Sequence, residues 1–363
     1  MKKLWIGIGI VVVVALAILL IVTQTTKEPE EIKIGAILPL TGPSALLGEI
    51  AKNGLLLSEQ DINANGGIKG KKLKIIFEDG MADPNKSISA FNKLITTDKI
   101  RFAITTHSGV GLALAPIADK HKIMLFVHAS HPGIVQESAF IFRHSNIAEQ
   151  ESEIIGAFIR KSFNMKNIAL AVMNDDYGLI FNKTLSNALA TNTEDNFINS
   201  VIYDQSETDF KTVTQQILRD KPQTVIVAGL GNGVGLLLRR LKEYGYGGNI
   251  IITLGAVATG AFKSAGESAK GVYYVELDFN TNDAKYKNLS NRYKKAFNSD
   301  LSSASTLFYN SLSLLSYANG EAGNNPEKVS NFIQNLSSYQ GIGEQMTING
   351  KNMVPPLKVI RNE

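Results

Sequence analysis

Short apolar segments alternate with longer amphipathic segments along the chain from Ile32 onward. The apolar segments are typical of buried strands. In the first amphipathic segment, Ala51, Leu55, Ser58 and Ile62 recur at helical spacing, which predicts one buried helix face. A regular alternation of strands and helices predicts doubly wound parallel sheets, because each helix carries the chain back to the start of the next strand.

The alternation forms two series. The first begins at Ile32–Leu38 and ends in a short strand at Phe140–Arg143, and the second runs from Ile168–Val172 to Gly271–Leu277. The remainder is mainly helical and ends in a strand-like tail. Two series with separate sheets predict an α/β protein of two Rossmann-like lobes, with a hinge and a cleft between them. We expect residues 32–143 and 280–339 in the first lobe, residues 144–279 and 340–363 in the second, and residues 1–31 before both.

The N-terminus has a different pattern. An apolar run, Leu4–Val22, follows Lys2 and Lys3 and is interrupted only by two glycines. Its 19 residues, at ~1.5 Å each, span roughly the ~30 Å core of a bilayer. We therefore expect an uncleaved transmembrane helix that anchors the protein, with Thr23–Glu31 as a tether; a removed signal peptide is the alternative. The two lysines favour the cytoplasmic side, which places the rest of the chain outside the cytoplasm.

The amino-acid composition excludes several classes of protein function. Of the 363 residues, 44% are hydrophobic and 19% are charged, which fits a folded globular protein. The net charge is only +4 and no long basic tract appears, so nucleic acid is not an expected partner. The sequence contains no cysteine. This excludes disulfides, thiolate metal sites, cysteine nucleophiles and the lipid-modified cysteine of a bacterial lipoprotein.

One stretch, Phe102–Pro132, predicts a strand, a helix and a second strand, each strand being followed by a polar loop. The first loop holds His107 and Ser108, and the second is the run 128–131, His-Ala-Ser-His. The carboxyl ends of parallel strands meet at one edge of a sheet, where open α/β sheets bind ligands. We expect this edge to form half of a binding cleft.

Motifs for nucleotide binding and catalysis are not matched. The four glycines at alternate positions of 229–235 do not give the G-x-G-x-x-G spacing, and no acidic residue follows at the usual distance. We interpret them as a turn that admits a ligand or the other lobe. No G-x-S-x-G motif appears. The adjacent Asp175 and Asp176 are better explained by turn and helix-cap chemistry than as a catalytic pair. No catalytic residue and no cofactor are expected.

All five histidines lie between His107 and His144. Imidazoles at the predicted cleft suit zinc or nickel. However, no pair with H-x-x-x-H spacing and no third ligand at a fixed distance are evident. We favour a hydrogen-bonding or ligand-contacting role for His131 over a metal site. A metal- or histidine-dependent hydrolase is retained as an alternative.

Several ordered segments together resemble type I periplasmic binding proteins of the branched-chain amino acid (leucine/isoleucine/valine) group, which serve as receptors of ABC transporters. The resemblance covers essentially all of the chain after residue 31. The segments that carry it are Ile34–Pro43 (IGAILPLTGP), Asp61–Gly70 (DINANGGIKG), Asp83-Pro84, Asn174–Gly178 (NDDYG) and Ala265–Gly271 (AGESAKG).

The resemblance implies two lobes that close on a small ligand, with chain crossings near 143–145, 277–280 and 339–343. It also implies that a ligand carboxylate is held by Ser108 and by Ala129, Ser130 and His131. Ser108 would offer its hydroxyl and its backbone N–H at the start of a helix, where the dipole favours an anion. His131 stands where the family often has threonine, and Tyr177 matches an aromatic residue of the second lobe.

The departures from the family pattern concern the opposite wall. Amino-acid binders of the family place an acidic residue after the strand equivalent to Ile250–Thr253, and here Leu254 follows. Leu230 and Leu47 stand where aromatic residues are common. A buried ammonium group without a counter-charge costs several kcal/mol. We therefore expect a carboxylate-bearing or similarly polar-headed ligand with an apolar body.

These inferences predict a membrane-tethered, extracytoplasmic solute-binding protein. It would capture a small molecule by closure and present it to an ABC permease in the membrane. An anchored sensor domain is the alternative within the binding class. The expected ligand-binding residues are Leu47, Ser108, Ala129, Ser130, His131, Tyr177, Leu230 and Leu254.

Overall fold

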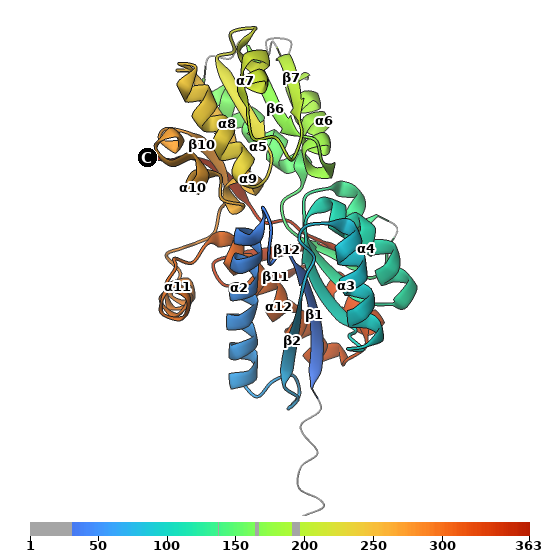
Figure 1. The fold of residues 1–363 in the computed structure, drawn as a ribbon. Coiled ribbons are helices and arrows are strands. Elements are labelled where there is room, and N and C mark those ends of the chain that lie inside the picture. Colours follow the sequence, from blue (N-terminus) through green and yellow to red (C-terminus); the bar gives the residue numbers. More distant parts are fainter. Residues whose placement is uncertain (1–30, 137, 164–166, 191–196) are drawn as a thin grey trace, which may run out of the picture.

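The computed structural model describes residues 31–136, 138–163, 167–190 and 197–363. They form two α/β lobes, one above the other, each with its own sheet and helices on both faces (Figure 1). The predicted two-lobed, doubly wound architecture is confirmed. The predicted membrane segment Leu4–Val22 lies outside the described residues. Within those residues, no helix combines the length and apolar character that crossing a membrane requires.

The first lobe is built on an eight-stranded sheet with the order β11-β12-β13-β5-β4-β3-β1-β2. Its central strands β1, β3 and β4 are almost entirely buried because helices cover both faces. Asp83 caps α3 by accepting a hydrogen bond from the Lys86 N–H at 2.8 Å, as predicted. The first-lobe strands are β1 (Ile32–Leu38), β2 (Leu73–Asp79), β3 (Phe102–Thr106), β4 (Met124–His128), β5 (Ile141–His144), β11 (Ser338–Gln340), β12 (Gln345–Asn349) and β13 (Asn352–Met353). The helices are α2 (Ala45–Ala64), α3 (Pro84–Thr96), α4 (Ser108–His121), the 3-10 turn η1 (Pro132–Val135), α11 (Ala284–Phe297), α12 (Ser303–Ala322) and α13 (Pro326–Gln334).

The second lobe is built on a six-stranded sheet with the order β14-β10-β9-β8-β6-β7. Asp175 caps its helix α6 by accepting from the Gly178 N–H at 2.7 Å, which confirms the cap interpretation of this residue. The strands are β6 (Ile168–Met173), β7 (Phe197–Tyr203), β8 (Thr224–Ala228), β9 (Asn249–Ile252), β10 (Tyr273–Leu277) and β14 (Leu357–Arg361). The helices are α5 (Ala148–Ser162), α6 (Asp176–Ala190), α7 (Lys211–Leu218), α8 (Asn232–Glu243), α9 (Leu254–Ala258), α10 (Ala261–Ala265) and the 3-10 turn η2 (Gly266–Ala269).

The third chain crossing lies later than the sequence predicted. The assignment of all of 340–363 to the second lobe is wrong for β12 and β13, because β13 pairs in parallel with β5 and β12 pairs with β13. Met346, Ile348 and Met353 bury their side chains in the first-lobe core. Only β14 joins the second sheet, antiparallel to β10. The crossing therefore follows Met353, where Pro355 and Pro356 interrupt strand pairing because proline has no N–H to donate.

The two lobes touch where two glycines of the second lobe meet the segment at the start of α2. Gly231, with φ of +69°, begins α8 next to Pro43 of the first lobe; a Cβ on it would lie 3.5 Å from the Pro43 carbonyl oxygen. A Cβ on Gly260 would lie 3.1 Å from the Leu46 side chain. The glycine-rich turn after β8 therefore faces the other lobe, in agreement with its interpretation from the sequence. These contacts describe a closed arrangement of the lobes.

Candidate functional site

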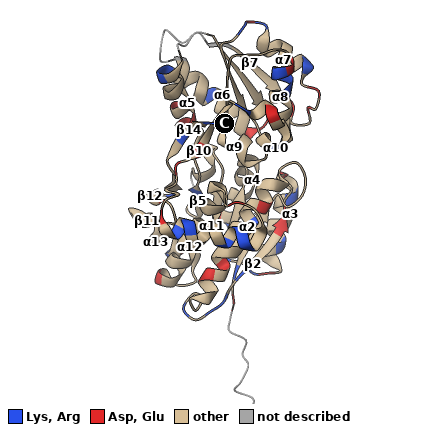
Figure 2. Cartoon of the chain, turned by 90° about the vertical axis from the view of Figure 1, so that its left-hand side faces the viewer, with Lys and Arg blue, Asp and Glu red and all other residues tan. Residues whose placement is uncertain are grey.

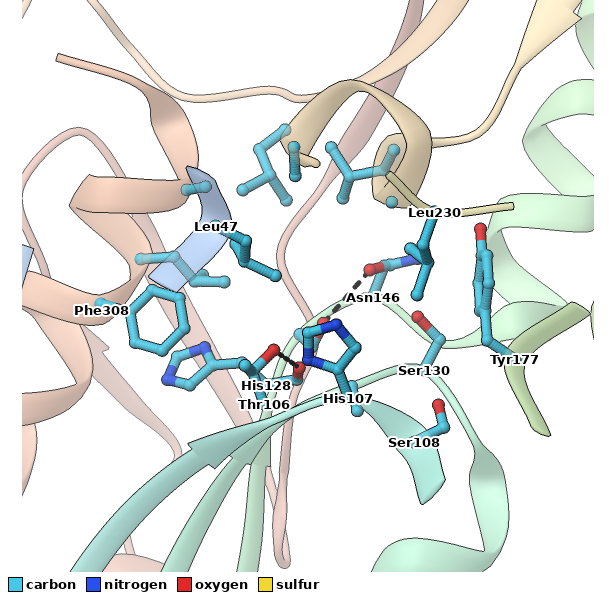
Figure 3. A pocket seen from close by; sticks show the side chains of 18 residues that line it. Leu47, Thr106, His107, Ser108, His128, Ser130, Asn146, Tyr177, Leu230 and Phe308 are labelled. Carbon is cyan, nitrogen blue, oxygen red and sulfur yellow. Dashed lines mark hydrogen bonds between the residues drawn. The ribbon is translucent and has the colours of Figure 1, made fainter. Parts of the chain in front are cut away.

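A cavity lies between the lobes, at the carboxyl ends of the strands of both sheets (Figure 3). It leaves about 100 Å³ for the centres of water-sized molecules, whereas one buried water needs roughly 10–15 Å³ on the same measure. A small organic ligand would therefore fit in place of several waters. Seven of the eight predicted residues line the cavity: Leu47, Ser108, Ala129, Ser130, Tyr177, Leu230 and Leu254.

The polar end of the cavity belongs mainly to the first lobe. Ser108 is the first residue of α4, and Ala129 and Ser130 follow β4 directly. The first N–H groups of a helix have no partner inside the helix, so the start of α4 favours an anion. The Thr106 hydroxyl donates to the His128 carbonyl at 2.9 Å and joins the ends of β3 and β4. The predicted strand–helix–strand unit thus brings Ser108 and Ser130 to one side of the cavity (Figure 3).

His131 is the one predicted residue that does not line the cavity. Its Nδ1 accepts a hydrogen bond from the Gly133 N–H at 3.1 Å and caps η1. Successive residues of an extended segment point to opposite sides, so Ser130 faces the cavity and His131 faces away. The expected ligand contact at His131 is not supported by this geometry. Arg143, buried to 2% exposure, donates to the Ser130 and Pro132 carbonyls at 3.5 and 3.3 Å and so holds this loop.

Two other histidines line the cavity. His107 precedes α4 with φ of +72°, and its Nε2 lies 3.3 Å from the Ser44 hydroxyl. Burial lowers the pKa of His107 to about 4, so its ring is neutral at pH 7. Burial also lowers the pKa of His128, whose ring lies 3.9 Å from that of Phe308. In the described part of the chain, no group of three or more histidine, aspartate or glutamate side chains is placed to hold a metal ion.

Much of the remaining surface of the cavity is apolar. Leu230 and Leu254 of the second lobe and Leu47 and Phe308 of the first line it. In Figure 3, Leu47 and Phe308 lie on one side of the cavity and Leu230 lies on the other. Among the described residues that line the cavity, none is aspartate, glutamate, lysine or arginine. Charged residues of both signs are instead spread over the helices of both lobes (Figure 2). Further apolar residues of the lining are Ala258, Leu277, Ala304 and Leu307.

A buried carboxylate stands directly behind the second-lobe wall. Glu151, on the first turn of α5, has no exposed surface. Its Oε1 accepts from the Leu254 N–H at 2.7 Å, and its Oε2 accepts from Asn146 Nδ2 at 3.0 Å and from the Tyr177 hydroxyl at 3.2 Å. All three partners line the cavity. Burial raises the pKa of Glu151 to about 7. Sequence reasoning missed this residue because an acid in a first helical turn is ordinarily solvated.

Comparison with known proteins assigns the fold. The family profile described as periplasmic binding protein matches residues 31–360. The Leu/Ile/Val-binding protein BraC3 of Rhizobium johnstonii is 30% identical over 227 residues, which are 61% of this chain and 60% of that protein.

Two solved structures have the same fold. One is the branched-chain amino acid transporter substrate binding protein of Streptococcus pneumoniae in complex with isoleucine, with a TM-score of 0.82 at 21% identity, over 92% of this chain and 100% of the other. The second is a Rhodopseudomonas palustris ABC-transporter solute binding protein in complex with 3,4-dihydroxybenzoic acid, with a TM-score of 0.81 at 21% identity, over 92% of this chain and 93% of the other. The chain therefore belongs to the periplasmic binding protein family.

Proposed function

We propose that this protein is the extracytoplasmic receptor of an ABC transporter and captures a small carboxylate with a largely apolar body. It binds its solute and catalyses no reaction. The ligand enters the open cleft, contacts the first lobe, and is enclosed when the second lobe closes over it. The closed form then presents the solute to a permease in the membrane. The observation that carries this proposal is the cavity itself, which has an anion-favouring helix start at one end and leucines at the other.

A carboxylate suits the polar end. Ser108 contributes a hydroxyl and the start of α4, and Ser130 contributes a second hydroxyl from the neighbouring strand end. Hydrogen bonds to a charged oxygen are the stronger kind, at about 1.5–3 kcal/mol each. The ligands in the two similar structures, isoleucine and 3,4-dihydroxybenzoic acid, both carry a carboxyl group.

The other groups of the ligand meet a surface without charged side chains. A free ammonium group there would lose its hydration without direct contact to a carboxylate, at a cost of several kcal/mol. Glu151 stands behind the wall, but both of its oxygens already accept hydrogen bonds from protein groups. We therefore favour a ligand without an ammonium group.

The N-terminal segment bears on where in the cell the protein is located. The apolar run Leu4–Val22 is long enough to span a bilayer and follows two lysines. We propose that it stays attached and holds the receptor at the outer face of the membrane, close to its permease.

The identity of the solute is tested by mass spectrometry of small molecules released from protein that was purified without added solutes. The expected result is one dominant carboxylic acid, which the Ser108→Ala variant retains to a much smaller extent. Recovery of a dominant ligand without a carboxyl group would contradict the proposal.

A further inference from the structure

We propose that Glu151 makes the second-lobe wall present hydrogen-bond acceptors to the cavity. The second polar group of the ligand must then be a neutral hydrogen-bond donor, a hydroxyl, rather than an acceptor such as a ketone. This inference rests on the proposed function, because it takes the carboxylate at the first lobe as given. It assigns a specificity-determining role to a residue that does not itself touch the ligand.

Glu151 makes three hydrogen bonds. Above its pKa of about 7 the carboxyl group is ionised and can only accept hydrogen bonds, so each of its partners donates a hydrogen to it. These hydrogens come from the Leu254 N–H, the Asn146 amide and the Tyr177 hydroxyl, at 2.7, 3.0 and 3.2 Å. The three partners belong to three separate segments of the second lobe, so Glu151 fixes the wall as a unit.

The orientation of the Asn146 amide follows from this contact. Its nitrogen has to face the Glu151 carboxylate, and its oxygen is thereby turned to the opposite side, where the Ser145 hydroxyl donates to it at 3.2 Å. Figure 3 shows the oxygen of Asn146 directed toward the interior of the cavity. An amide oxygen has two acceptor positions, and Ser145 uses one of them.

Tyr177 is constrained in the same way. Its hydroxyl hydrogen is directed at Glu151, and burial raises the pKa of Tyr177 well above its ordinary value, so the hydroxyl keeps that hydrogen. The Tyr177 oxygen can therefore only accept a further hydrogen bond. Asn146 and Tyr177 therefore both present acceptors to the cavity, while the Glu151 oxygens are occupied by protein donors.

The position of these groups makes them relevant to the ligand. In Figure 3, Ser108, Ser130, Asn146 and Tyr177 occupy the same side of the cavity. A ligand whose carboxylate lies at Ser108 and Ser130 brings its neighbouring carbon toward Asn146. A hydroxyl on that carbon donates to the wall. A ketone oxygen would meet acceptors and remain unpaired in a buried site, which binding sites discriminate against strongly.

The test uses matched pairs of acids that differ only at the carbon next to the carboxylate. One pair is 2-hydroxy-4-methylpentanoate and 4-methyl-2-oxopentanoate, and the other is mandelate and phenylglyoxylate. Isothermal titration of the full chain at pH 8.5, where Glu151 is ionised, is expected to give at least about tenfold tighter binding of the hydroxy acid in the pair that fits the cavity. Leucine, with the ammonium at the same carbon, serves as the third probe and is expected to bind more weakly than its hydroxy analogue.

Glu151→Gln is the informative variant. A glutamine accepts from the Leu254 N–H but donates to Asn146, which reverses the amide and presents its nitrogen to the cavity. The preference for the hydroxy acid is expected to fall about tenfold or to reverse. Glu153→Gln, at an exposed position two residues along the same helix, is the matched control and should keep the wild-type ratio.

The outcomes separate the two proposals. A preference for hydroxy over oxo acid that is lost in Glu151→Gln alone supports the inference. Equal binding of both acids, or a ratio unchanged in a Glu151→Gln variant with an intact melting transition, overturns the inference and leaves a carboxylate receptor. Tighter binding of leucine than of its hydroxy analogue overturns the choice of a neutral donor. Binding of none of the five probes overturns the proposed ligand class and the inference with it.

Discussion

Asp176 of the second lobe lies directly against Gly109 of the first lobe: a Cβ added to Gly109 would come within 2.7 Å of the Asp176 Oδ2. Gly109 is the second residue of α4 and Asp176 is the first residue of α6. The carboxylate therefore sits by the positive end of the α4 dipole, which is favourable. Because the two residues belong to different lobes, opening of the cleft would separate them, and close approach of the lobes here requires a glycine at 109.

We predict that Gly109→Val weakens ligand binding by roughly tenfold or more, because the added side chain holds the lobes apart; overpacking of this kind costs about 1–3 kcal/mol. Isothermal titration with the solute identified by mass spectrometry measures the effect. Gly320→Val, at a helical position where a Cβ meets nothing within 4 Å, is the control. Equal affinities of both variants would show that the contact does not govern closure.

Ser108→Ala should reduce affinity for a carboxylate ligand about ten- to a hundredfold, since it removes a hydrogen bond to a charged oxygen worth about 1.5–3 kcal/mol. The melting temperature of the ligand-free protein should stay close to that of the wild type. Ser89→Ala, on the exposed surface of α3, provides the comparison and should bind normally. Unchanged binding by the Ser108 variant would show that this hydroxyl does not bind the ligand carboxylate.

The raised pKa of Glu151 predicts a pH dependence of stability. Burial lifts this pKa from its ordinary 4.5 to about 7, so the folded protein binds more protons than the unfolded chain between these values. The contribution of Glu151 to the free energy of unfolding is therefore greatest below pH 4.5 and is lost as the pH rises to about 7. At ~1.36 kcal/mol per pH unit, the loss amounts to about 3 kcal/mol.

Urea denaturation of wild type and Glu151→Gln at pH 5, 6, 7 and 8 checks this prediction. The variant should gain stability relative to the wild type as the pH increases, because its side chain stays neutral throughout. Subtracting the two curves cancels the other titrating groups. A difference that is constant with pH would mean that Glu151 ionises normally in the folded protein.

The membrane anchor is tested by fractionation. The chain with its N-terminal segment should sediment with membranes and keep the 39.4 kDa mass of the uncleaved sequence. A chain that begins at residue 31 should be soluble and bind the solute with equal affinity, because it keeps every residue named in the cavity lining. Recovery of the native protein in the soluble fraction with its N-terminal segment removed would establish cleavage instead.

Local patterns were sufficient to predict the two-lobed fold and half of the cavity. The strand–helix–strand unit placed its two loops at one sheet edge, and the family resemblance selected Ser108 and Ala129 within those loops. The loop after β4 shows the limit of this reasoning, because a shift of one residue decides whether Ser130 or His131 faces the ligand. Sequence spacing does not fix that shift, whereas the hydrogen bond of His131 to Gly133 does.

Features that depend on contacts between distant segments escaped prediction. β12 and β13 have clear strand patterns, but nothing in those patterns tells which sheet edge they join. Glu151 lies 103 residues from Leu254 along the chain, and their hydrogen bond exists only after the second lobe has folded. The sequence correctly showed no acid after β9, yet the folded protein places the Glu151 carboxylate on the Leu254 N–H, behind the cavity wall.

The three crossings lie next to one another and are joined by hydrogen bonds. The Ser145 N–H donates to the Met353 carbonyl at 3.2 Å, and the Asp278 N–H donates to the Pro356 carbonyl at 2.8 Å. Crossings joined in this way move together, so we expect opening of the cleft to be a hinge motion about them. Solutes that permit the same closure would then give the molecule the same outer shape, and selection among solutes would rest on the cavity lining.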